Sequence, residues 1–280
     1  MLMLQSPAKI NLFLRLLYRR PDGYHELASL FQAIDLMDEI HFSLAKEDRL
    51  TCTDPTIPTD ASNLILKAAD LFRRKTGLTF GLQAHLVKKI PHQAGLGGGS
   101  GNAATAFWAL NQLTGFKACT EDLRLWASEI GSDVAFFLSE GTAYCTGRGE
   151  ILHPLPPLPK QTAWIIKPAK GTSTPAVYKK VDLSRVAPRD PQIALRKFID
   201  GNPEYFNDLE MPAMEVMPEL VPIKKKLSGL GFHTVLLSGS GSSFFCLGDP
   251  ISRPHIHGCA VYQGSWINRT ANSWYNASFG

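Results

Sequence analysis

Apolar and polar residues alternate along the first part of the chain. Residues 9–16, Lys9-Ile-Asn-Leu-Phe-Leu-Arg-Leu16, follow a two-residue period, which predicts a half-buried strand. The turn-forming triplet Pro21-Asp-Gly23 comes soon after it. Residues 27–36, 39–44 and 81–88 are also predicted to form strands. This half of the chain is therefore expected to be rich in strands.

Between and after these strands, the apolar positions change to helical spacing. Asp60-Ala-Ser-Asn63 offers N-cap residues for a helix that runs to about Lys75. The apolar residues within 103–113 predict a second helix, which follows a glycine cluster. Thr120–Ile130 predicts a third helix, with acidic residues in its first turn.

A proline-rich segment divides the chain. His153-Pro-Leu-Pro-Pro-Leu-Pro159 is stiff and cannot lie inside a sheet. A chain of 280 residues is also long enough for about two domains of ordinary size. We therefore predict two domains, residues 1–152 and residues 161–280, joined by this linker.

The second half mixes strands and helices in irregular order. Residues 164–166 and 233–237 predict strands, and residues 191–199 and 218–227 predict helices. The strand at 233–237 runs directly into a second glycine cluster, Ser238-Gly-Ser-Gly-Ser-Ser243. Because these elements form no regular βαβ repeat, the predicted fold class is α+β.

Composition narrows the classes of protein that the chain can belong to. Its hydrophobic fraction of 44% and charged fraction of 19% are those of a globular protein, which excludes a disordered chain and a coiled coil. The net charge of +4, with no basic block, suits an anionic small molecule and predicts no nucleic-acid partner. The longest uncharged stretch, between Lys89 and Lys117, contains Pro91 and several glycines, so no membrane span is predicted.

The number and spacing of the cysteines indicate the cellular compartment in which the protein is expected. The five cysteines are widely spaced and form no C-x-x-C pair, which predicts neither a disulfide framework nor a structural zinc site. The start of the chain has no signal-peptide layout, so a cytoplasmic location is expected. The sequence predicts no oligomeric state.

The cluster Gly95-Leu-Gly-Gly-Gly-Ser100 is the strongest local signal for chemistry. Glycine permits positive φ and lets a ligand approach the backbone, and the following helix start favours phosphate. No Lys-Ser/Thr pair follows, so the cluster is not a Walker A loop. The spacing also fits a dinucleotide-binding fingerprint poorly, which disfavours an oxidoreductase. The alternative is a ligand-free glycine turn.

Three other features are ambiguous when each is taken alone. Asp133, between a helix end and an apolar run, is either a base or a local cap. Lys9 in its apolar strand is either functional or a lysine whose stem reaches to water. Tyr24 and His25 after the Pro-Asp-Gly turn are either a binding pair or ordinary loop residues.

Taken together and in order, these motifs resemble one family. The segments are Pro7–Leu14, Arg20–Glu26 with its Pro-Asp-Gly-Tyr-His element, Ile90–Ala104, Gly131–Val134 and Leu237–Gly241. The chain resembles the GHMP kinase superfamily over nearly its whole length, to about residue 248. The resemblance implies a two-domain α+β fold, with an N-terminal domain like domain 2 of ribosomal protein S5 and a ferredoxin-like C-terminal domain. It also implies ATP-dependent phosphorylation of a small alcohol with Mg²⁺, and the Tyr-His element points to a cytidine-diphosphate-linked alcohol.

The resemblance assigns roles to residues at matching positions. Lys9 and Asp133 would be catalytic, with Asp133 orienting or deprotonating the acceptor hydroxyl and Lys9 steadying the developing charge. The residues implied for ATP are Asn63, Leu64, Lys88, Pro91, Gly95, Leu96, Gly97, Gly98, Gly99, Ser100 and Asn102. Those implied for the substrate are Asn11, Tyr24, His25, Thr174, Pro175, Tyr178 and Gly239. No metal-ligand cluster is visible, and Ser100 is the candidate to touch Mg²⁺.

The sequence departs from the family pattern in a few places, and two rival functions stay open. Gly101 stands where a polar residue is more usual, Ala135 where proline follows Asp-Val, and Tyr178 where phenylalanine is more usual. Residues 253–280 match nothing that we identify. The rivals are another GHMP kinase, of the mevalonate or homoserine type, and a non-catalytic binding protein with this fold.

Overall fold

The computed structural model describes residues 1–275. Its strands are β1 (Leu2–Arg19), β2 (His25–Ala45), β3 (Arg49–Cys52), β4 (Gly81–Val87), β5 (Thr142–Thr146), β6 (Ile151–Pro154), β7 (Thr162–Pro168), β8 (Phe206–Asn207), β9 (Thr234–Leu237), β10 (Phe244–Leu247) and β11 (Cys259–Ser265). Its α-helices are α1 (Leu64–Thr76), α2 (Gly98–Leu113), α3 (Thr120–Ile130), α4 (Thr174–Lys179), α5 (Pro191–Ile199), α6 (Glu210–Val216) and α7 (Leu220–Ser228), with 3-10 helices η1 (Ala135–Leu138) and η2 (Leu183–Arg185). None of these helices is long and apolar enough to cross a membrane.

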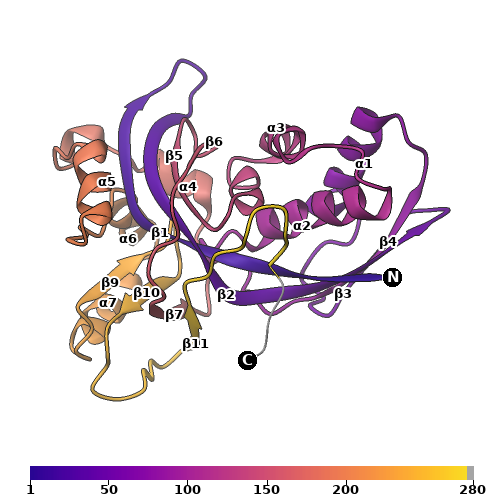
Figure 1. Ribbon diagram of the computed structural model, residues 1–280. Helices are drawn as coiled ribbons and strands as arrows, with labels where there is room; N and C mark the ends of the chain where they lie inside the picture. The colour runs from indigo at the N-terminus through magenta and orange to yellow at the C-terminus, as the bar shows by residue number, and fades with distance from the viewer. Residues whose placement is uncertain (276–280) are drawn as a thin grey trace.

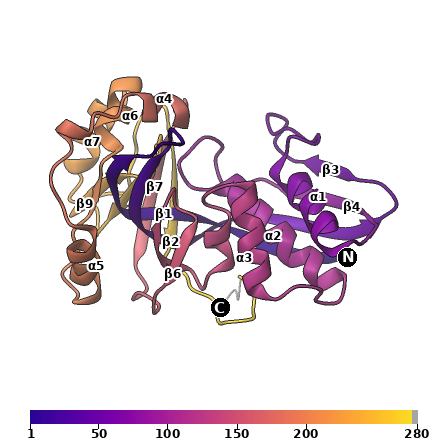
Figure 2. The ribbon, with the colours of Figure 1, turned by 90° about the horizontal axis from the view of Figure 1, so that it is seen from above.

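A long antiparallel hairpin, β1 and β2, runs through both halves of the molecule (Figure 1). Its register pairs Leu2 with Phe42 at one end and Arg19 with His25 at the other. The larger sheet has the order β3-β4-β2-β1-β8, and β5 and β6 extend it beside β2. Figure 2 shows α1, α2 and α3 together over one end of the hairpin and α4 to α7 around the other.

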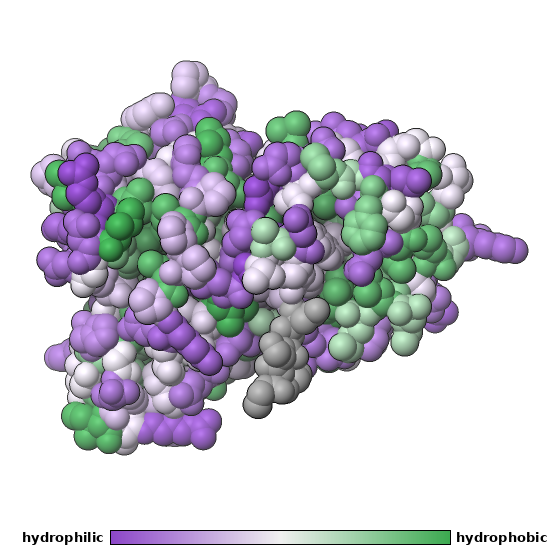
Figure 3. All heavy atoms as spheres, in the orientation of Figure 1, coloured by the Kyte–Doolittle hydropathy of each residue, from purple (hydrophilic) through white to green (hydrophobic). Residues whose placement is uncertain are grey.

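The second sheet has the antiparallel order β11-β7-β10-β9. In chain order this is 4-1-3-2, as expected for the ferredoxin-like domain. Residues 248–258, between β10 and β11, contain neither helix nor strand. Apolar residues of both sheets form one buried cluster, in which Ile10 and Leu12 of β1 join Ile165 of β7 and Phe245 of β10. On the face shown in Figure 3, hydrophilic and hydrophobic residues are interspersed.

Much of the predicted local structure is confirmed. The helices predicted at 120–130 and 191–199 have those bounds, and Asn63 caps α1 by accepting from the Ile65 amide at 2.9 Å. The two strands predicted at 27–36 and 39–44 are one continuous strand, β2, because the pairing with β1 carries on past the interruption. Sequence periodicity missed β3, β5, β6, β8, β10, β11, α4 and α6, each of which has at most seven residues and so shows little of a period.

The prediction that the proline-rich segment cannot lie inside a sheet is wrong for its first two residues, because His153 and Pro154 end β6 and pair with β5 at the edge of the sheet. Residues 155–161, between β6 and β7, have no regular structure. The last described residues return to the larger sheet, since Trp266 forms a bridge to Ile34 of β2. Trp274 and Tyr275 join the cluster that packs α2 against β1 and β2. The limits 1–152 and 161–280 stay a prediction, and residues 276–280 lie outside the described part.

Candidate active site

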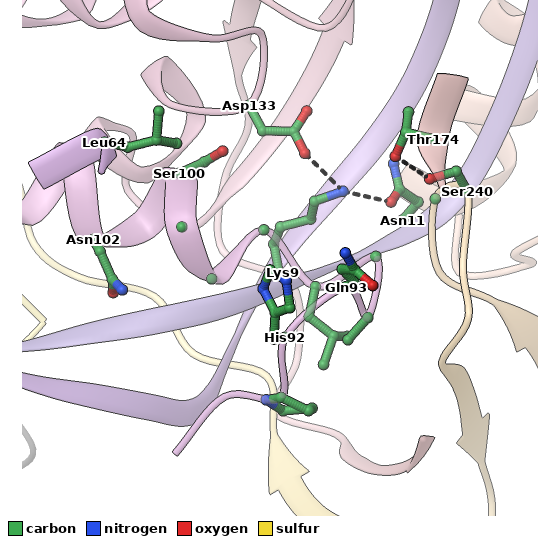
Figure 4. A pocket seen from close by; sticks show the side chains of 18 of the residues that line it. Lys9, Asn11, Leu64, His92, Gln93, Ser100, Asn102, Asp133, Thr174 and Ser240 are labelled. Carbon is green, nitrogen blue, oxygen red and sulfur yellow. Dashed lines mark hydrogen bonds and ion pairs between the residues drawn. The ribbon is translucent and has the colours of Figure 1, made fainter. Parts of the chain in front are cut away.

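A cavity of about 470 Å³ opens where the two sheets, α1, α2 and the second glycine cluster meet. Figure 4 shows many of the side chains on its wall. The predicted residues that line it are Lys9, Asn11, Asn63, Leu64, Lys88, Pro91, Gly95, Leu96, Gly97, Gly98, Gly99, Ser100, Asn102, Asp133, Thr174, Tyr178 and Gly239. Three predicted substrate residues, Tyr24, His25 and Pro175, do not line it.

Lys9 and Asp133 meet inside this cavity, from β1 and from the turn after α3. Lys9 Nζ lies 3.1 Å from Asp133 Oδ2 and donates to Asn11 Oδ1 at 2.8 Å (Figure 4). The Lys9 side chain is only 4% exposed. The alternative prediction, a lysine whose ammonium reaches bulk water, is therefore wrong. Asn11 in turn donates to Ser29 Oγ of β2 at 2.9 Å, which fixes the amide that holds the lysine.

Asp133 stands just before η1 and is the more accessible partner, with its side chain 31% exposed. Within residues 1–275 its carboxylate accepts no backbone hydrogen bond, so the alternative role as a local cap has no support there. An accessible carboxylate held beside a buried ammonium can orient a hydroxyl and accept its proton.

The first glycine cluster changes conformation partway along. Gly95 and Gly97 have positive φ values of 73° and 69°, whereas α2 already begins at Gly98. The backbone N–H groups of Gly98, Gly99 and Ser100 come before the first intrahelical bond, from Gly101 N to Gly97 O. These free donors at a helix N-terminus, on the wall of a cavity, suit the phosphates of a nucleotide.

The second glycine cluster supports the first. Ser238 Oγ donates to the Gly95 carbonyl at 3.0 Å, and the Ser243 amide donates to the Ala94 carbonyl at 3.1 Å. A Cβ on Gly95 would lie 2.1 Å from the Ser238 carbonyl oxygen, so only glycine fits this contact. The two clusters, far apart in sequence, therefore form one wall.

Lys88 is held by a carboxylate that the sequence reasoning missed. Its Nζ lies 2.7 Å from Oδ2 of Asp38, which is fully buried, and it also donates to the Ile90 carbonyl. Asp38 Oδ1 accepts from the amides of Lys89 and Ile90 at 2.7 and 2.8 Å. This pair anchors the segment that leads into the first glycine cluster. Residues 34–42 also contain Asp35, Glu39 and His41, so no local pattern in the sequence set Asp38 apart.

Tyr24 and His25, which the resemblance assigns to the cytidine-linked substrate, lie beside the cavity wall. The His25 ring lies 5.4 Å from the ring of Tyr178, which does line the cavity. Tyr24 is exposed, and the guanidinium of Arg148 lies 5.0 Å from its ring centroid. Burial, with a smaller effect of the Arg19 charge, lowers the pKa of His25. Burial, followed by the nearby Asp133 charge, raises the pKa of Tyr178.

The lining residues outside the predicted set include Arg148 and Ser240. Arg148, in the turn between β5 and β6, lies between two glycines, a pattern that could have drawn attention to it. Ser240 shares a 2.8 Å hydrogen bond with Thr174 Oγ1, which ties α4 to the second glycine cluster (Figure 4). Over residues 1–275, no three His, Cys, Asp or Glu side chains are grouped so that they could hold a metal ion.

Comparison with known proteins shows strong relationships. Residues 63–141 match the family described as GHMP kinases N terminal domain. A protein named 4-diphosphocytidyl-2-C-methyl-D-erythritol kinase from Protochlamydia amoebophila (strain UWE25) is 52% identical, over 97% of this chain and 92% of that protein. The chloroplastic enzyme of the same name from Arabidopsis thaliana is 44% identical, over 98% of this chain and 76% of that protein.

Solved structures agree with the sequence relatives. A crystal structure of 4-(cytidine 5'-diphospho)-2C-methyl-D-erythritol kinase is 34% identical, has a TM-score of 0.80 and covers 95% of this chain and 100% of that chain. A mevalonate kinase with a TM-score of 0.66 is only 13% identical, with 96% and 100% coverage, and shares the fold alone. The predicted fold class is therefore confirmed.

Proposed function

Because this chain belongs to the 4-diphosphocytidyl-2-C-methyl-D-erythritol kinase family, we propose that it transfers the γ-phosphoryl group of ATP to the 2-hydroxyl of 4-diphosphocytidyl-2-C-methyl-D-erythritol, a step of the non-mevalonate isoprenoid pathway. The observation that carries this proposal is the Lys9–Asp133 pair in the same cavity as the free amides of α2. The part of the cavity at the start of α2 suits phosphate, and the neighbouring part at Lys9 and Asp133 suits a reacting hydroxyl.

ATP binds at the two glycine clusters. The triphosphate lies against the amides of Gly98, Gly99 and Ser100, and the base and ribose lie toward Asn63, Leu64 and Lys88. Support for this placement comes from the cavity, which all six residues line. Because Lys88 is paired with Asp38, its role is to shape this wall, and the backbone amides carry most of the phosphate recognition.

Asp133 and Lys9 act on the acceptor hydroxyl. The carboxylate of Asp133 orients the hydroxyl and accepts its proton as the bond to phosphorus forms, and the Lys9 ammonium stabilises the developing negative charge. Asn11 keeps Lys9 in place. Phosphoryl transfer depends mainly on positioning and electrostatics, so two fixed opposite charges supply what the step requires.

The residues present also fit Mg²⁺. This ion keeps several waters and takes one or two protein oxygens along with phosphate oxygens. The Ser100 hydroxyl, in the first turn of α2, points toward the side of the cavity where Asp133 lies (Figure 4). When bound, the ion would neutralise phosphate charge.

The cytidine end of the substrate extends toward the β1–β2 turn. We place its base beside Tyr24, His25 and Tyr178, with Thr174, Pro175 and Gly239 along the path. The contact between the His25 and Tyr178 rings supports this placement, because it joins the turn to the cavity wall. The cytoplasmic location stays a prediction.

The test is ATP consumption with a panel of acceptors. We expect turnover with 4-diphosphocytidyl-2-C-methyl-D-erythritol and none with free methylerythritol, mevalonate or homoserine. Turnover with mevalonate or homoserine in place of the cytidine-linked alcohol would assign the chain to another GHMP kinase activity. ATP binding without turnover on any acceptor would favour a binding protein.

A further inference from the structure

One short helix, η1, lies next to three parts of the proposed catalytic machinery, which are Asp133, the aromatic ring under Lys9 and the first glycine cluster. Asp133 lies two residues before it. Phe136 packs edge-on against Phe31 at 5.2 Å between ring centroids, and Lys9 Nζ lies 4.5 Å above that same Phe31 ring. On the other side, a Cβ on Gly97 would lie 2.9 Å from Phe137 Cζ, so this ring is in close contact with the phosphate-binding turn. A shift of η1 would therefore move the base, the lysine and the glycine cluster together.

The far end of η1 is held by a residue near the C-terminus. Arg269 donates from Nη2 to the Leu138 carbonyl at 2.6 Å and from Nε to the Ser139 carbonyl at 2.8 Å. The last carbonyls of a helix lack partners within the helix and need outside donors. Arg269 supplies two such donors from one planar group. Arg124 also donates to the Leu138 carbonyl, at 3.1 and 3.2 Å, and Tyr275 to the Ser139 carbonyl at 3.2 Å, but the bonds from Arg269 are the shortest at both carbonyls.

Arg269 itself is fixed from all sides. It is only 7% exposed, and its guanidinium lies 5.2 to 5.6 Å from the ring centroids of Trp108, Trp274 and Tyr275. Its third donor, Nη1, reaches the Ser273 carbonyl at 2.5 Å. A charged group in such a cage has one available orientation, so the carbonyls that it binds are fixed as well.

We propose that Arg269 is a positioning residue for the kinase reaction. By binding the Leu138 and Ser139 carbonyls it sets the location of η1, and through η1 it holds Asp133 opposite Lys9 and Phe137 against the phosphate-binding turn. The catalytic part of this inference rests on the proposed function. The structural part, the control of η1 by the C-terminal segment, does not depend on it.

The first test measures turnover in Arg269→Ala and Arg269→Lys. For Arg269→Ala we expect kcat to fall about 10- to 100-fold, the size of effect that a displacement of about 1 Å can cause, while KM for ATP stays within about twofold. Free guanidinium at non-denaturing concentration should restore part of the rate, because the vacated cage keeps its carbonyls and rings. Arg269→Lys keeps the charge but has fewer donors, so its kcat should lie between those of Arg269→Ala and the unaltered protein.

A matched control separates positioning from stability. Phe198→Leu removes packing in the cluster between the two sheets, away from η1, and should lower thermal stability while leaving kcat of the folded enzyme unchanged. If Arg269→Ala lowered stability to the same extent with unchanged kcat, Arg269 would be merely structural and the proposal would be wrong.

The second test needs no substrate. Amide hydrogen exchange across residues 135–138 should become faster in Arg269→Lys than in the unaltered protein, whereas exchange in α5 should stay the same. Unchanged exchange in η1 would overturn the proposal even if the chain proved to lack kinase activity. Absence of turnover in the unaltered protein, with η1 exchange still dependent on Arg269, would instead refute the proposed function.

Discussion

Lys9 and Asp133 differ sharply in their access to water. The Lys9 side chain is 4% exposed and that of Asp133 is 31% exposed. A buried ammonium is costly unless it is paired, and here Asp133 and Asn11 supply the partners at 3.1 and 2.8 Å. The lysine therefore has a fixed position, while the carboxylate keeps an open side for a substrate hydroxyl.

Asp133→Asn tests this division of roles. The amide keeps an oxygen toward Lys9 but cannot accept a proton, so kcat should fall about 10²- to 10⁴-fold while ATP affinity is kept. Steady-state kinetics and calorimetric ATP titration would measure both, with the exposed Asp70→Asn on α1 as the control. A rate near that of the unaltered enzyme would leave Asp133 without its catalytic role.

His25 gives a prediction about pH. Burial and the Arg19 charge lower its pKa from the usual 6.5, so in the folded protein the imidazole is neutral at pH 7 and gains its proton only at lower pH. The neutral ring offers one donor and one acceptor to the cytosine edge, and protonation removes the acceptor. KM for the cytidine-linked substrate should therefore rise as the pH falls below 6.5, whereas KM for ATP should not follow it.

His25→Gln is the matched variant, because an amide has a donor and an acceptor but does not titrate in this range. Its KM for the cytidine-linked substrate should lack the rise at low pH. His25→Ala should reduce the preference for cytidine-linked over uridine-linked acceptors. An unchanged preference in His25→Ala would make the residue an ordinary loop histidine.

At the scale of the element, the first glycine cluster uses its glycines in two ways. Gly95 and Gly97 are needed for positive φ and for close contacts, whereas Gly98 and Gly99 belong to the first turn of α2. A Cβ on Gly99 would meet only Leu64 Cδ1, at 3.6 Å, which is an ordinary contact. Gly99 is therefore the position where an added side chain enters the cavity without disturbing the fold.

We expect Gly99→Val to fold normally and to weaken ATP binding by at least about tenfold, which is about 1.4 kcal/mol. Gly97→Ala should instead destabilise the protein by about 1–3 kcal/mol, because φ is +69° there and the Cβ would lie 3.0 Å from Lys9 Cγ. ATP titration and denaturant unfolding distinguish the two. Unchanged ATP affinity in folded Gly99→Val would refute the phosphate-binding role of the α2 N-terminus.

At the scale of the whole molecule, the long hairpin makes the two halves interdependent. Within β1, Ile10 and Leu12 pack in the cluster between the sheets, and Leu14 and Leu16 pack with residues of β9 and β10. The short strand β8 from the second half pairs with β1. Without the second half, these apolar side chains would face water, at about 1.5–3 kcal/mol for each.

Residues 1–152 expressed alone should therefore fail to fold cooperatively, even though the proline-rich segment marks their end. Near-ultraviolet circular dichroism and thermal unfolding would show the loss, and mixing with residues 161–280 should restore part of the signal. A sharp unfolding transition in the isolated fragment would contradict this and would support two independent domains.

The sequence by itself determined the local structure and the character of the site. Capping at Asn63, the helix at 120–130 and the helix start after the first glycine cluster depend on neighbours within a few residues, so their pattern is visible in the sequence. The order of the motifs that contain Lys9 and Asp133 also identified the family, because these motifs reflect the residues that the function requires and not only the preference for a fold.

Only the tertiary structure decided which residues from distant parts of the chain contact one another. Lys9 with Asp133, Asp38 with Lys88, and Arg269 with the end of η1 are pairs from distant parts of the chain, and no local pattern links their members. The continuity of β2 likewise came from its pairing with β1. Burial and chain topology select such partners, because a buried charge or an unpaired carbonyl is stable only where the fold brings its partner to it.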